Sequence, residues 1–111
     1  IRAVAAYLEM NTEFVISSTL KKDNALHGQD KVLAICKELE ATEYYNAIGG
    51  QQLYSKEDFA RQGIQLSFLD TRSIRYVQGS GEFQPNLSIL DVLMYNPKEQ
   101  VQEMLREYDL R

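Results

Sequence analysis

Two spacings of hydrophobic residues alternate along the chain, and they predict helices separated by short strands. Apolar positions recur at intervals of three and four in residues 1–9, 29–40, 56–62, 87–95 and 97–108, which is typical of amphipathic helices. Compact apolar or alternating runs near residues 12–18, 43–47 and 64–69 predict three strands. Because strands and helices alternate, we expect an α/β fold, with a small parallel sheet of about three strands flanked by helices.

Helix boundaries can be predicted from the residue types that satisfy free backbone groups. Ser55, followed three positions later by Asp58, predicts the start of one helix, and Gly63 predicts its end. Asn96 and Pro97 are suited to the N-cap and first position of the last helix. The apolar face of that helix would then consist of Val101, Met104, Leu105 and Tyr108.

A second helix start follows Pro85, which has no N–H and is excluded from a helix interior. Asn86 is a suitable N-cap for this helix, and Ser88 with Asp91 offers an alternative start. The long, irregular and glycine-containing segment 70–84 precedes it. Such a helix N-terminus either binds an anion or is capped by its own side chains and binds no ligand.

Size and charge restrict the class of protein. The chain has 111 residues, of which 44% are hydrophobic and 25% charged, a composition typical of a globular domain. A net charge of −4 disfavours nucleic-acid binding, and no apolar run is long enough to predict a membrane span. Because Ile1 lies inside an amphipathic pattern, we expect residues 1–111 to be a single α/β domain or the C-terminal half of a larger one. Open sheet edges would then pair with the other half or in an oligomer.

Candidate chemistry lies where parallel strands end. Three groups of residues follow the three expected strands: Ser17, Ser18 and Thr19; Asn46, Gly49 and Gly50; Asp70, Thr71 and Arg72. Together they would form an anion-contacting rim, or they are ordinary turn residues. His27 is expected to be an exposed loop residue and Cys36 a buried, inert thiol. We predict no metal site and no cofactor, and no nucleophile–base pair identifies catalytic residues.

Four stretches of the sequence occur in an order and at spacings that resemble the WbqC-like protein family. They are Lys31–Leu39, Ala41–Tyr44 with Gly49, Gly50, Leu53 and Tyr54, Gly63–Phe68, and Phe83–Leu93. The resemblance spans residues 12–96 and corresponds to the C-terminal half of the family's usual length. The chain departs from the family pattern at Glu40, where a glycine is frequent, and at Ser73–Arg75, where His-Pro is common. It also lacks the family's N-terminal His-Gln-Pro motif.

The resemblance implies a cytoplasmic protein of bacterial surface-polysaccharide biosynthesis. The implied reaction is transfer of an acyl or aminoacyl group, such as glycine, to an amino sugar, and the implied partner is an anionic small molecule or a nucleotide-sugar. The matching residues that it marks as substrate-binding are Gly49, Gly50, Tyr54, Tyr76, Gln78, Asn86 and Ser88. Without the N-terminal motif, we expect the isolated chain to show no turnover. The alternative is a non-catalytic α/β binding or assembly module.

Overall fold

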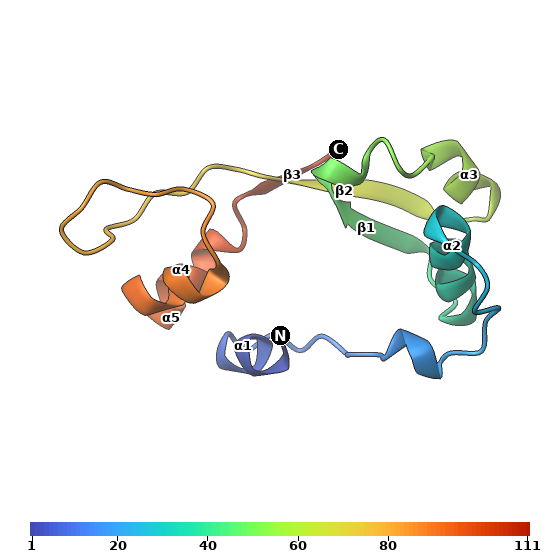
Figure 1. Cartoon of the computed structure of the whole chain (residues 1–111), viewed down its shortest axis with the longest axis horizontal. Helices are drawn as coiled ribbons and strands as arrows, with labels where there is room; N and C mark the ends of the chain where they lie inside the picture. The colour runs from blue at the N-terminus through green and yellow to red at the C-terminus, as the bar shows by residue number, and fades with distance from the viewer. The chain divides into compact units, whose positions relative to one another are not determined.

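The computed structural model describes residues 1–111 and separates into two compact units. Unit 1 contains residues 1–14 and 71–108, and unit 2 contains residues 15–70 and 109–111. Five helices and a three-stranded sheet make up the regular structure (Figure 1), which confirms the predicted α/β class.

The sheet has the strand order β1-β2-β3 and mixed direction. Strand β1 (Glu43–Ala47) runs parallel to β2 (Gln65–Thr71), with Tyr44 opposite Leu66. Strand β3 (Tyr108–Leu110) lies on the other side of β2. Phe68 and Arg111 exchange both backbone hydrogen bonds at 2.9 Å, which is the pattern of an antiparallel pair. The β1–β2 pair is therefore parallel as predicted, whereas the third strand is antiparallel.

Helices α2 (Gly28–Glu38) and α3 (Lys56–Arg61) enclose the core of unit 2 together with β2. This core contains Cys36, Phe59, Ile64, Leu66 and Phe68. Tyr44 of β1 stacks on Phe59, with ring centroids 5.5 Å apart, and extends the core across the sheet. The alternation of buried and outward residues along β2 follows the sequence pattern that predicted this strand.

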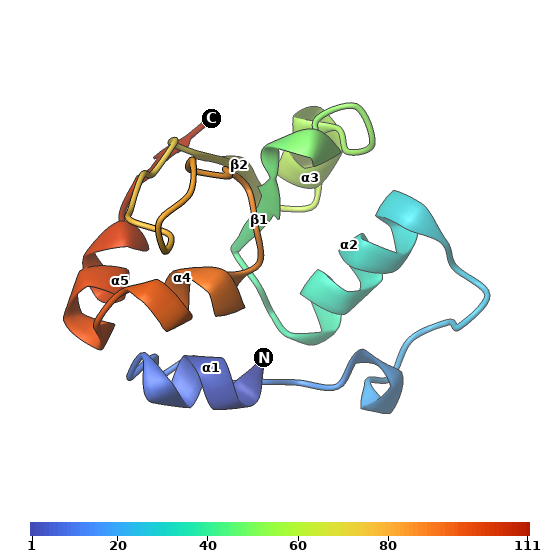
Figure 2. The same cartoon turned by 60° about the vertical axis from the view of Figure 1, so that its left-hand side comes forward.

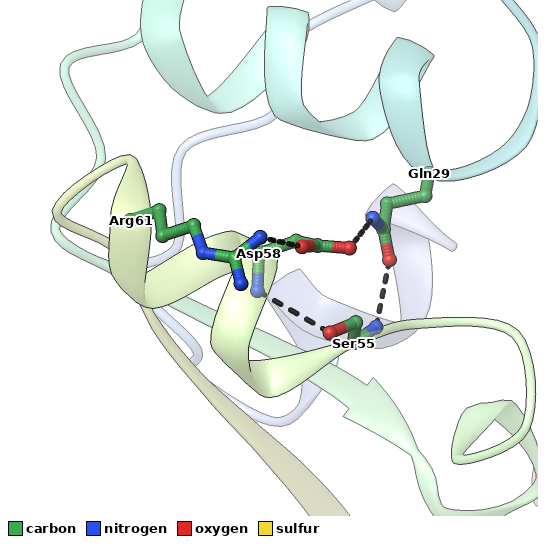
Figure 3. Close-up of polar contacts among 4 residues, drawn as sticks. All are labelled: Gln29, Ser55, Asp58 and Arg61. Atoms are coloured by element: carbon green, nitrogen blue, oxygen red, sulfur yellow. Dashed lines mark hydrogen bonds and ion pairs between the residues drawn. The ribbon is translucent and has the colours of Figure 1, made fainter.

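A polar cluster joins the start of α2 to the start of α3 (Figure 3). The Ser55 hydroxyl accepts from the Asp58 N–H at 3.3 Å, which confirms Ser55 as the predicted N-cap. The Gln29 side chain accepts from the Ser55 N–H at 2.7 Å and donates to the Asp58 carboxylate at 2.9 Å. Arg61 completes the cluster with an ion pair of 3.0 Å to Asp58. These bonds satisfy two of the free N–H groups at the start of α3, those of Ser55 and Asp58.

Unit 1 contains α1 (Arg2–Tyr7), α4 (Ile89–Tyr95) and α5 (Lys98–Met104), which pack side by side (Figure 2). Their small core is centred on Leu8, Val92 and Val101. The Gln102 amide donates to the Leu8 carbonyl at 2.9 Å and so satisfies a free carbonyl group at the end of α1.

The strand predicted near residues 12–18 is wrong. Phe14, Val15 and Ile16 are exposed and irregular, and Ser17–Thr19 form a short 3-10 helix, η1. A short apolar run does not by itself fix its structure, and here no neighbouring strand supplies the hydrogen bonds that a strand requires. The third strand of the sheet is instead formed by residues 108–110. The sequence pattern predicted that Tyr108 lies on the apolar face of the last helix.

One helix start follows the second of the two alternatives that the sequence offered, and another differs from the prediction. Ser88, not Asn86, is the N-cap of α4, because its hydroxyl accepts from the Leu90 N–H at 3.2 Å. Asn96 is not the N-cap of α5, which begins after Pro97. The buried Asn96 side chain donates backwards to the Val92 carbonyl at 2.8 Å and so closes the end of α4.

Candidate functional site

A cavity of about 520 Å³ lies within unit 1. It is lined by the segment after β2, by residues just before α4, and by the end of α5: residues 71–76, 83, 85–87, 92, 104, 105, 107 and 108. This volume falls within the range of small-molecule pockets. The long irregular segment that follows β2 therefore forms one wall of the cavity.

Tyr76 and Asp91 join this wall to α4. The Tyr76 hydroxyl donates to the Asp91 carboxylate at 2.6 Å, and the Gln78 amide donates to the same oxygen at 2.8 Å. The hydrogen bond to Asp91, and secondarily desolvation, raise the pKa of Tyr76, because both favour the protonated phenol. Tyr76 is therefore held as a hydrogen-bond donor to Asp91.

Gln78 closes the loop that leads to α4. Its side-chain oxygen accepts from the Gln84 N–H at 2.7 Å, and its amide donates to the Gln84 carbonyl at 3.0 Å. The side chain thus pairs with Gln84 as a neighbouring strand would. Gly79, at φ +55°, makes the turn that this closure requires.

The two arginines of the cavity differ in their partners. Arg72 pairs with Glu107 at 3.6 Å, whereas the guanidinium of Arg75 lies 5.1 Å from the centre of the Phe83 ring and forms no ion pair. Tyr76 contacts the same ring edge-on, with centroids 5.3 Å apart. The Asp91 carboxylate, bonded to Tyr76, stands with Glu107 against the two arginines, so the formal charges of the site balance and Arg75 is the cavity arginine that forms no ion pair.

The start of α4 has few backbone amides to offer a ligand. The Leu90 N–H is bonded to the Ser88 hydroxyl, and the Asp91 N–H to the Ser88 carbonyl at 3.0 Å. Asn86 lies two residues before this cap, with its backbone at φ +58°. Asn86 is one of the residues that line the cavity. The N-terminus of α4 therefore leaves few free N–H groups for a ligand.

The seven predicted substrate-binding residues fall in both units. Tyr76 and Asn86 line the cavity, Gln78 supports its wall, and Ser88 caps the adjacent helix. The other three, Gly49, Gly50 and Tyr54, belong to unit 2.

The unit 2 residues have structural contacts of their own. Gly50 lies so close to Asn46 that a Cβ at position 50 would be 3.2 Å from its side chain. Tyr54 packs edge-on against Tyr44, with centroids 6.1 Å apart.

The expected rim of nine residues is not a single rim, because no strand precedes Ser17–Thr19. The Asn46 side chain is engaged by Tyr44 and by the Ala47 N–H. Thr71 and Arg72 do line the cavity of unit 1. Cys36 is buried as predicted, and this burial raises the pKa of its thiol.

Sequence reasoning missed Asp91, Arg75 and Phe83 as members of the site. Asp91 carried a usable signal, because it is the only charged residue in the apolar run of α4 and a carboxylate in such a run needs a partner. Phe83 begins the stretch that resembles the family, which was a usable signal, whereas Arg75 carried none, since the segment around it shows no periodicity.

Comparison with known proteins gives one match. Residues 1–103 match the model of the WbqC-like protein family, which is a longer match than the resemblance over residues 12–96. No curated protein and no solved structure matches the chain. None of the helices of the structure has the length and apolar character needed to cross a bilayer.

Proposed function

The chain belongs to the WbqC-like protein family, and from this premise we propose that it serves bacterial surface-polysaccharide biosynthesis in the cytoplasm. The proposed reaction transfers an acyl or aminoacyl group, such as glycine, to an amino sugar carried on a nucleotide. In that transfer the sugar's amine nitrogen bonds to the acyl carbon, the donor's leaving group departs with its electron pair, and the nitrogen loses a proton.

One observation supports a ligand site in unit 1. Two single residues that match the family pattern, Tyr76 and Gln78, meet the matching stretch Phe83–Leu93 through their hydrogen bonds to Asp91. They do so on the wall of the cavity. Packing alone does not require two polar residues from an irregular loop to converge on one carboxylate, and such networks hold functional side chains in place.

The seven residues taken from the resemblance have different proposed roles. We assign direct ligand contact to Tyr76 and Asn86, because both line the cavity. Gln78 and Ser88 are proposed to hold the loop and the helix in position. Gly49, Gly50 and Tyr54 are proposed as a second contact region on unit 2.

Deleting the gene in its host tests this function. Mass spectrometry of the surface polysaccharide should then show amino sugars that lack the acyl group, and the wild-type gene should restore it. Arg75→Gln should fail to restore it, whereas Arg61→Gln, outside the cavity, should succeed. An unchanged polysaccharide in the deletion strain would refute the proposed function.

A specific observation favours the alternative, a non-catalytic assembly module. Helix α4 is apolar on nearly every side, and its Leu90 and Met94 side chains are 61% and 83% exposed. Such a helix is normally covered. If assembly is the role, Leu90→Ser with Met94→Ser should abolish a concentration-dependent increase in mass measured by light scattering, while the Arg75→Gln protein should assemble as wild type does.

A further inference from the structure

We propose that the cavity of unit 1 binds the phosphate of a nucleoside diphosphate through Arg75 and Asn86, with the ring portion of the ligand against Tyr108. This inference rests on the proposed function for the choice of nucleotide as ligand class. The binding that it describes requires no transfer reaction.

The first argument concerns charge. Arg75 is the arginine of the cavity without a carboxylate partner, because Glu107 is paired with Arg72. Its guanidinium is held over the Phe83 ring at 5.1 Å. A guanidinium placed in this way keeps its N–H groups free at the edge, and these groups suit bidentate binding of phosphate.

The second argument concerns the backbone of Asn86. Three residues other than glycine have positive φ, namely Glu9, Glu40 and Asn86. The first two immediately follow the helix C-caps Leu8 and Leu39, where this conformation closes a helix. Asn86 closes no helix, yet it lines the cavity beside Pro85 and Leu87. Asparagine is one of the few residues that tolerate this conformation, and here the turn places residue 86 in the cavity lining rather than at the end of a helix.

The third argument concerns the rest of the cavity surface. Val92, Met104 and Leu105 supply an apolar wall, and Tyr108, 38% exposed, supplies an aromatic ring. A bare phosphate ion would gain nothing from these groups. A ligand that joins a phosphate to a ring uses both the charged and the apolar parts, and the volume of about 520 Å³ suits a small molecule.

Calorimetric titration with uridine diphosphate tests the inference on the complete chain. We expect saturable binding to the wild type that is at least about tenfold tighter than the binding of inorganic phosphate. Arg75→Gln should weaken it by about tenfold or more, and Arg75→Lys by less, because one charge-assisted contact is removed or made poorer. Arg106→Gln is the matched control, since Arg106 is an exposed arginine of the same unit outside the cavity.

Asn86→Gly separates ligand contact from backbone role. Glycine adopts positive φ without strain, so thermal unfolding should show unchanged or higher stability while affinity for uridine diphosphate falls. Unchanged affinity in Asn86→Gly or Arg75→Gln, or an equal loss in Arg106→Gln, would overturn the inference. So would the absence of saturable binding to the wild type, or equal affinity for inorganic phosphate. Binding without any change of the host polysaccharide would refute only the proposed transfer function.

Discussion

At the scale of single residues, Glu40 shows how backbone conformation explains a departure from a family pattern. Residues 40 and 41 donate to the Lys37 and Cys36 carbonyls at 3.1 and 2.8 Å, and Glu40 has φ +53°. The same closure occurs after α3 with Gly63 at φ +76°. These bonds form the Schellman arrangement, whose left-handed position is usually glycine. The glycine frequent in the family at position 40 therefore fits the geometry better than glutamate does.

Glu40→Gly should accordingly raise the free energy of unfolding by about 1 kcal/mol, because glycine avoids the steric cost of the left-handed conformation. Urea denaturation measures the change. Glu38→Gly is the matched control: position 38 is the last residue of α2, and there glycine should lower the stability. If the Glu40→Gly protein is no more stable than the wild type, the left-handed conformation of Glu40 does not lower the stability of the protein.

The stability that Tyr76 contributes to the folded protein should depend on pH in the alkaline range. Its pKa is raised in the folded protein, chiefly by the hydrogen bond to Asp91. The sign follows from linkage: the protonated phenol contributes stability that is complete below the ordinary tyrosine pKa of about 10 and is lost as pH rises through the raised value. Wild type should therefore lose more stability between neutral and alkaline pH than Tyr76→Phe. Tyr44, whose pKa is also raised, is present in both proteins and cancels in the comparison.

At the scale of elements, local signals in the sequence predicted local structure well. The range of β1 and the cap of α3 at Ser55 were predicted correctly, because strand patterning and capping depend on neighbouring residues. The exposed run of Phe14, Val15 and Ile16 and the misplaced start of α5 show the limit. Whether an apolar run becomes a strand depends on a partner strand, and that partner is not encoded nearby.

The Gln29 cluster is an element-scale contact that no local pattern predicts, since it joins residues of α2 and α3 that are 26 positions apart. Gln29→Ala should lower the free energy of unfolding by about 1 kcal/mol, because the Ser55 N–H and the Asp58 carboxylate each lose a partner. Gln52→Ala, at an exposed turn position, is the control and should change stability by less than about 0.5 kcal/mol. Equal effects of the two substitutions in thermal or urea unfolding would contradict the assigned role.

At the scale of the whole molecule, the order of elements did not reveal which residues share a unit. Unit 1 combines residues 1–14 with residues 71–108, so the segments that form its core are far apart in sequence. The candidate site could be predicted only in part for the same reason. Tyr76 and Asn86 were found through the resemblance, whereas the hydrogen bond of Tyr76 to Asp91 spans 15 positions across an irregular loop.

Strand β3 gives the last prediction, because it lies outside the family match over residues 1–103 and yet completes the sheet. Removing residues 109–111 should leave the backbone N–H and C=O of Phe68 without their partners and make β2 an edge strand. We expect a loss of about 2 kcal/mol, from two backbone hydrogen bonds of about 1 kcal/mol each. Faster hydrogen exchange of the Phe68 amide should accompany this loss.

Arg111→Gln is the matched control, since it keeps the strand and removes only the partly exposed 2.6 Å ion pair with Asp70. An exposed pair contributes less than about 1 kcal/mol, so this variant should retain slow exchange at Phe68. If Arg111→Gln and the truncation are equally destabilised, the ion pair rather than the strand accounts for the effect. If neither variant changes the exchange of Phe68, the third strand does not contribute to the stability of the sheet.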